Sequence, residues 1–116
     1  AQCAADAVGR AGETEAMRTA GERWLIRNQK PDGGWGAGKE ATVEETALAV
    51  IALLGGNASC HAAAERGRCR LTEAWRSGET LRAAPIGLYF SVLWYHERLY
   101  PVVWSLEALA TVRTPT

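Results

Sequence analysis

The string QKPDGGWG at positions 29–36 constrains the fold more than any other feature of this sequence. It separates two segments in which apolar residues recur at helical spacing. Proline cannot continue the helix that precedes it, and the glycines that follow favour a tight turn. The sequence therefore predicts a helix–turn–helix unit with its turn in this string.

Each side chain of this turn has a mechanical role that its chemistry suggests. Gln29 carries two donors and an acceptor, and we expect it to serve the unpaired carbonyls at the end of its own helix. Asp32 is expected to accept from free N–H groups at the start of a neighbouring helix. Gly33 and Gly34 permit positive φ. Trp35 offers a broad face that can stack on the glutamine amide and cover the turn.

The segments on either side of the turn carry helix signals. Residues 15–29 place apolar side chains at helical spacing, which predicts one apolar face made of Ala16, Ala20, Trp24 and Leu25, with Met17. After the turn, Thr42 is followed three residues later by Glu45, a capping box that predicts a helix from position 43 to 54. Gly55 lies where a left-handed C-cap would end that helix.

The rest of the chain is also predicted to be helical. Ser59 is expected to cap a third helix, which Gly67 weakens. Residues 86–100 predict a strongly apolar helix, and Pro101 begins a new helix or kinks this one. No stretch shows sustained strand alternation, so the predicted fold class is all-α. Several of these helices are apolar over wide arcs, which implies packing neighbours on more than one side.

Length and charge exclude some classes of function. The chain has 116 residues, 13 of them basic and 13 acidic, which suits one small domain or a fragment of a larger one. The formal net charge of zero argues against a nucleic-acid partner, which requires a clustered basic face. The sequence contains no run of about 18 apolar residues, so no membrane-spanning helix is predicted. The sequence opens with Ala1 rather than Met, which indicates a cut at the front.

The cysteines do not form a recognisable pattern. Cys3, Cys60 and Cys69 are odd in number and lack zinc-finger spacing, so we expect neither a disulfide framework nor a metal site. A metal site at Cys60 and His61 is the less favoured alternative. Thiols without a chemical role in a reducing compartment are the simpler interpretation.

Three segments, in this order, resemble the terpene cyclase/prenyltransferase superfamily, and within it the squalene–hopene cyclase group. The first is the Q-x-x-D-G-x-W turn, known there as the QW motif. The second is TVEETALAVIALL at 42–54, and the third is the aromatic segment PIGLYFSVLWYHERLYP at 85–101. The resemblance implies that residues 1–116 are the C-terminal part of an (α/α)6 barrel, with 1–14 and 113–116 frayed. It also implies structural, bracing roles for Gln29, Asp32, Gly33 and Trp35.

The chain departs from the family pattern in two places. A second QW turn is expected before the aromatic segment, and only residues 74–78 stand in its place. The Asp-x-Asp-Asp acid of class II cyclases is absent, since aspartate occurs only at Asp6 and Asp32. Glu44 and Glu45 are explained by the dipole of the helix they begin, so no catalytic residue is predicted.

The implied function of the parent protein is cyclisation of a squalene-like isoprenoid through carbocations. Aromatic faces stabilise a carbocation by about 0.5–2 kcal/mol each without trapping it. The predicted cavity residues are Tyr89, Phe90, Trp94, Tyr95 and Tyr100. The alternative is that these aromatics form ordinary inter-helix core, as we expect of Trp24 and Trp104. The implied partners are the isoprenoid and the rest of the parent chain; the location is cytoplasmic, at a membrane surface; and no cofactor is needed.

Two other functions remain open on the sequence. A protein prenyltransferase β-like subunit would share the fold and would need a zinc site made of Asp, Cys and His. A non-catalytic helical-repeat module would use the ring of helices only as a scaffold for binding.

Overall fold

The computed structural model of the chain describes residues 11–83, 85–88, 93–96 and 98–110, the two middle ranges by their backbone alone. Its helices are α2 (Ala11–Asn28), α3 (Val43–Leu53), α4 (Ala58–Ser77) and α5 (Tyr100–Ala110), with a short 3-10 helix η1 (Glu79–Leu81). The strands β1 (Pro85–Leu88) and β2 (Leu93–His96) form an antiparallel pair. The packed body is helical, which confirms the predicted helical fold class for that body.

Helix α3 begins as the sequence predicts. The Thr42 hydroxyl accepts a hydrogen bond from the Glu45 backbone N–H at 3.1 Å, which satisfies one of the free donors of the first turn. The end of the helix differs from the prediction. Its C-cap is Leu54 in the right-handed region, and the described glycines with positive φ are Gly33 and Gly78, so the left-handed cap at Gly55 is wrong.

Helix α4 is continuous through Gly67, and its cap is Asn57 instead of the predicted Ser59. The Asn57 side chain accepts from the Cys60 backbone N–H at 3.1 Å. Asparagine and serine are both good N-caps, so the sequence alone does not choose between positions two residues apart. The helix ends at Gly78, whose φ of 79° is the left-handed C-cap conformation.

The predicted helix over 86–100 is wrong. The backbone there forms the β1–β2 pair, in which Pro85 lies opposite His96 and Leu88 opposite Leu93. An apolar run of this kind has no periodicity that separates a buried helix from a strand, and its aromatic and branched residues favour extended structure. Pro101 then lies in the first turn of a separate helix, α5, which was one of the two predicted alternatives.

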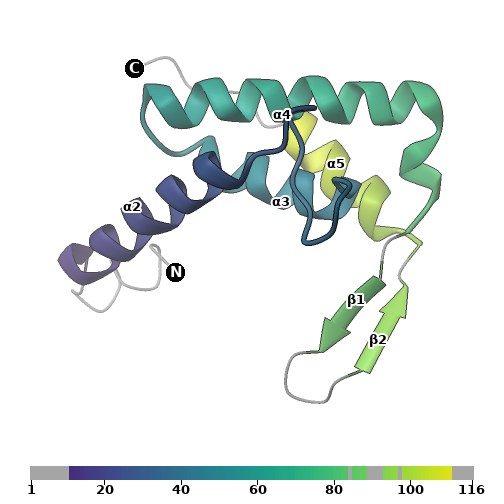
Figure 1. Ribbon diagram of the computed structural model, residues 1–116, viewed down its shortest axis with the longest axis horizontal. Helices are drawn as coiled ribbons and strands as arrows, with labels where there is room; N and C mark the ends of the chain where they lie inside the picture. The colour runs from purple at the N-terminus through teal and green to yellow at the C-terminus, as the bar shows by residue number, and fades with distance from the viewer. Residues whose placement is uncertain (1–10, 84, 89–92, 97, 111–116) are drawn as a thin grey trace.

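The core lies around α3. Helix α4 runs along one side of α3 and α5 packs beside it, while α2 extends away from the body at the lower left and the β1–β2 pair projects downward (Figure 1). The core consists mainly of small and aliphatic side chains: Val43, Ala47, Ala49, Val50, Leu53, Cys60, Ala63, Ala64, Leu71, Ala74, Ala108 and the ring of Trp35. Small residues let the helix backbones approach one another closely, because little side-chain volume separates them.

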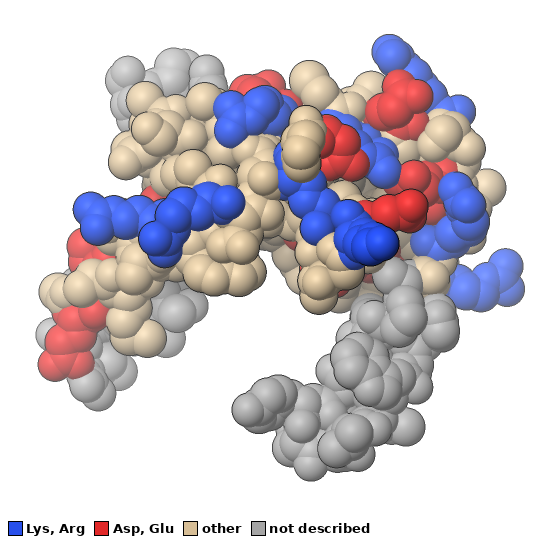
Figure 2. Space-filling model, viewed as in Figure 1, with Lys and Arg blue, Asp and Glu red and all other residues tan. Residues whose placement is uncertain are grey.

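Helix α2 contacts this core with only part of the face that was predicted. Leu25 of that face and its neighbour Ile26 pack against the core, whereas Met17 is 73% and Trp24 56% exposed. The prediction that Trp24 is core is therefore wrong. Figure 2 shows acidic and basic side chains next to one another on the right-hand side, where α4 ends, and the surface there has mixed charge.

Candidate functional site

The turn between α2 and α3 has a backbone conformation that only glycine allows. Gly33 has a φ of 93°, and a Cβ built there would lie 2.6 Å from the Arg66 carbonyl oxygen of α4. Within the turn, the Lys30 backbone N–H donates to the Gly34 carbonyl at 2.8 Å. The positive φ expected at Gly33 is confirmed, and the close approach to α4 gives a second reason for glycine.

Gln29 joins the turn to α4. Its side-chain amide donates to the carbonyls of Gly33 and Ala63, both at 2.9 Å. Its side-chain oxygen accepts from Arg66, at 2.6 Å from the nearer guanidinium nitrogen. The prediction that Gln29 serves the carbonyls of its own helix is therefore wrong, because its partners lie in the turn and on a helix more than thirty residues away.

Trp35 connects the same turn to the core. Its side chain is buried, and its indole N–H donates to the Leu25 carbonyl of α2 at 2.7 Å. Its backbone N–H donates to the Thr46 hydroxyl of α3 at 3.0 Å. The ring also lies against Gly67 of α4, where a Cβ would be 2.9 Å from it. One residue thus connects three helices, consistent with the predicted bracing role.

Asp32 has different partners from those predicted. One carboxylate oxygen accepts from the Gly34 backbone N–H at 2.9 Å, and the other pairs with Arg70 of α4 at 3.2 Å. Arg70 also pairs with Glu79 at 2.5 Å. Although burial acts to lower the pKa of Arg70, hydrogen bonds to Glu79 and Asp32 raise it above its ordinary value.

Two arginines that were not among the predicted site residues complete this unit. Arg66 and Arg70 are four residues apart and therefore lie on one face of α4. This spacing is visible in the sequence. Their acceptors could not be deduced from the sequence, since Gln29 and Asp32 lie 37 and 38 residues earlier in the chain.

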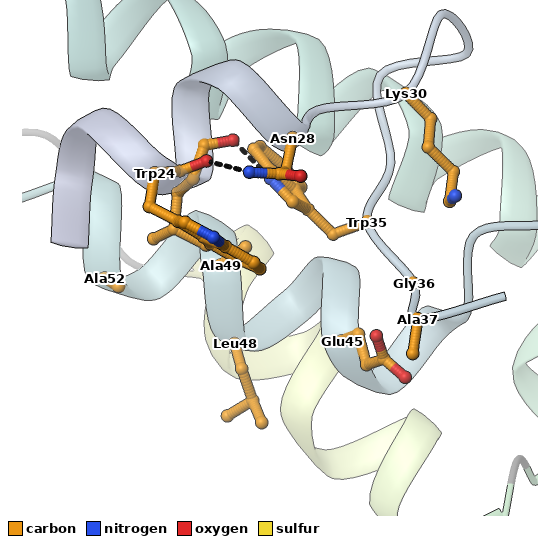
Figure 3. Close-up of a pocket in the computed structure, with 11 residues that line it drawn as sticks. Trp24, Asn28, Lys30, Trp35, Gly36, Ala37, Glu45, Leu48, Ala49 and Ala52 are labelled. Carbon is orange, nitrogen blue, oxygen red and sulfur yellow. Dashed lines mark hydrogen bonds between the residues drawn. The ribbon is translucent and has the colours of Figure 1, made fainter.

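An apolar groove, here called the α2–α3 groove, runs between these two helices beside the turn. Its volume is about 640 Å³, within the range of small-molecule sites. Figure 3 shows Trp24 and Trp35 reaching toward α3, with Leu48 and Glu45 projecting from α3 itself. The other lining residues are Leu25, Asn28, Lys30, Gly36, Ala37, Ala49 and Ala52.

Most of the predicted cavity aromatics cannot be placed as side chains. Tyr89 and Phe90 lie outside the described residues, and Trp94 and Tyr95 belong to β2, which is described by its backbone alone. Tyr100 begins α5, and its ring stacks on Trp104 with centroids 4.3 Å apart. Trp104 is half-buried against the core, as predicted.

The segment at 74–78, which stands in place of a second QW turn, is the end of α4 and its glycine cap. Trp75 donates its indole N–H to the Ser105 hydroxyl of α5 at 3.1 Å. This tryptophan thus connects α4 to α5 through one hydrogen bond, and unlike Trp35 its side chain remains 37% exposed.

The two glutamates in the first turn of α3 differ in exposure. Glu44 is 3% exposed, whereas the side chain of Glu45 is exposed.

The Cys60 thiol is buried and donates to the Glu22 carboxylate at 3.0 Å, an interaction that the sequence did not suggest. Burial, followed by this hydrogen bond, raises the pKa of Cys60.

An uncharacterized protein of Bradyrhizobium diazoefficiens, blr2149, is 37% identical to this chain over 76 residues. The match covers 66% of this chain and 15% of that protein's length. No family model and no solved structure matches the chain.

No three His, Cys, Asp or Glu side chains among the described residues converge as a metal ion would require. None of the helices in the described part of the chain has both the length and the apolar character needed to cross a bilayer.

Proposed function

We propose that this chain forms part of the helical barrel of a polyprenoid cyclase of the squalene–hopene type. The observation that carries the proposal is the set of contacts of Gln29 and Trp35. Together these residues join α2, α3 and α4 through hydrogen bonds of 2.7–3.0 Å. A bracing turn of this kind suits an enzyme that must keep its shape while an exothermic cyclisation proceeds.

In this proposal the chain contributes part of the cavity wall and a brace for the barrel. The initiating acid comes from another part of the whole protein. Of the two aspartates, Asp32 is occupied by its contacts with Arg70 and with the Gly34 backbone N–H, which suit a residue of the brace. The reaction begins when an acid protonates a terminal alkene, and successive alkenes then attack the carbocation. It ends with loss of a proton or addition of water.

Tyr100, whose ring stacks on the core residue Trp104, is the described part of the proposed aromatic wall. Aromatic faces attract a carbocation by about 0.5–2 kcal/mol each and supply no nucleophile that would trap it. The Tyr100 and Trp104 rings are stacked with their centroids 4.3 Å apart, and this stacking limits the movement of the exposed aromatic face. We propose that the isoprenoid passes along this side of α5.

The test uses the whole protein that carries this sequence, incubated with squalene and with shorter polyprenes, with products identified by mass spectrometry. We expect cyclic hydrocarbons or alcohols. We also expect Tyr100→Leu to change the product distribution, whereas Trp35→Phe, which changes only the brace, leaves it unchanged. Absence of cyclic products from every polyprene, under conditions in which the protein is folded, would refute the proposal.

A further inference from the structure

Helix α5 carries Tyr100 in its first turn, and a buried hydroxyl follows in the next turn. Ser105 is 0% exposed, and its hydroxyl accepts a hydrogen bond from the Trp75 indole N–H of α4 at 3.1 Å. The same hydroxyl donates to the Pro101 carbonyl, and the Val102 carbonyl lies 3.2 Å away as a second acceptor. These contacts connect α4 to the part of α5 that carries the proposed wall residue.

The hydrogen bonds of Ser105 have a fixed direction. An indole N–H can only donate, so the Ser105 oxygen accepts from Trp75 and its single proton goes to a backbone carbonyl. The Pro101 carbonyl lies four residues before Ser105, and a serine hydroxyl that donates to this position often bends its helix. The shape of the first part of α5 therefore depends on which carbonyl the hydroxyl serves.

The same part of α5 holds the aromatic stack. Pro101 directly follows Tyr100 in the sequence. Ser105 directly follows Trp104, the ring on which Tyr100 stacks. If the Ser105 hydroxyl turned from the Pro101 carbonyl to the next carbonyl along, the bend of the helix would change and the stack would move with it. The Trp75 N–H limits this rotation, because it occupies one side of the Ser105 oxygen.

Helix α4 also holds α5 at a second point. The Arg68 guanidinium donates to the Leu109 carbonyl at 3.0 Å, near the other end of α5. Arg68 and Trp75 are seven residues apart, so both contacts come from one face of α4. Leu109 lies nine residues after Tyr100, which is about 14 Å along the helix axis. The Trp75 contact is therefore close to the aromatic stack, and the Arg68 contact is remote from it.

We propose that Trp75 and Ser105 are positioning residues, which orient Tyr100 in the cavity wall and thereby influence which cyclic product forms. The attraction between a cation and an aromatic ring requires the cation to lie over the ring face. A change in the orientation of Tyr100 therefore alters the rates of competing cyclisation steps unequally. This inference rests on the proposed cyclase function and adds the residues that control the choice of product.

The test compares variants of the whole protein that carries this sequence, incubated with squalene and with the shorter polyprenes. Trp75→Phe removes the indole N–H but keeps an aromatic ring, and Ser105→Ala removes the hydroxyl. We expect each variant to change the ratio of cyclic products by about 3- to 10-fold. The double variant should change the ratio no more than the single variants do, because the two residues act through one contact.

Arg68→Met is the matched control, since it removes the remote contact between α4 and α5 and keeps the contact close to Tyr100. It should leave the product ratio of the parent unchanged, and urea unfolding should show that all the variants are folded. If the parent makes cyclic products, an unchanged ratio in Trp75→Phe and Ser105→Ala would overturn the positioning role and leave the proposed function standing. An equal change in Arg68→Met would do the same. Absence of cyclic products from the parent would refute both.

Discussion

The side-chain amide of Gln29 donates to the carbonyl oxygen of Ala63 at 2.9 Å, across 34 positions of sequence. The same amide donates to Gly33 in the turn, so one planar group holds the turn against α4. This contact explains why the residue at position 29 needs both donors and an acceptor.

Replacement of Gln29 by alanine should lower the free energy of unfolding by about 1–3 kcal/mol, because two carbonyls are left without their donor. Gln29→Glu should cost at least as much at neutral pH, since a carboxylate would face both carbonyls while it kept its pairing with Arg66. That loss should shrink as the pH falls toward about 4.3, the pKa of glutamate in the unfolded chain, and be smallest below it, because the protonated carboxyl no longer places a charge against the carbonyls. Urea unfolding at neutral and acidic pH measures both effects, and equal stability of Gln29→Glu and the parent at pH 7 would contradict the assignment.

Gly67→Ala tests the packing of the turn on α4. The new methyl group would lie 2.5 Å from Val50 and 2.9 Å from the Trp35 ring, so we expect a loss of about 1–3 kcal/mol from overpacking. Gly21→Ala in α2 is the matched control. Nothing lies within 4 Å of its Cβ, and it should raise stability by about 0.5–1 kcal/mol through helix propensity. Thermal or urea unfolding of the two variants should give changes of opposite sign; a stabilised Gly67→Ala would show that α4 is less close to the turn.

Trp35 combines packing with one hydrogen bond, and two substitutions separate these contributions. Trp35→Phe removes the indole N–H that donates to Leu25 and should cost about 1–3 kcal/mol, mainly because that carbonyl loses its donor. Trp35→Ala also removes the buried ring and should cost about 3–5 kcal/mol. Denaturant midpoints measure both. Similar small losses for the two variants would mean that the ring contributes little to the core.

Cys60 should make the stability of the chain depend on alkaline pH. Its pKa is raised by burial and by the hydrogen bond to Glu22, so the folded state holds the thiol proton more tightly than the unfolded state. The resulting stabilisation is complete below the unfolded thiol pKa of about 8.5 and is lost as pH rises from there through the raised folded value. Cys60→Ala should reduce the pH dependence of the urea midpoint between pH 8 and the raised pKa of the folded Cys60 thiol. Iodoacetamide should modify the exposed Cys69 before Cys60, and equal rates would contradict the burial of Cys60.

Local signals in the sequence determined several parts of this structure. The Thr42 cap sets the start of α3, the proline after α2 limits that helix, and Gly33 takes the positive φ that its turn requires. These features depend on residues within four positions of one another, where sterics and a single hydrogen bond decide the outcome. The helical body of the fold and the turn at 29–35 followed from them.

Tertiary structure decided the rest, because the deciding partners lie far away in the sequence. The partners of Gln29 and Asp32, the exposure of Trp24 and the burial of Cys60 all depend on how α2 meets α4. Residues 85–88 and 93–96 form a strand pair because an apolar run without clear periodicity can serve as helix or strand, and here the two stretches pair with each other. Periodicity shows which residues prefer to be buried; only the packed chain determines which of them are.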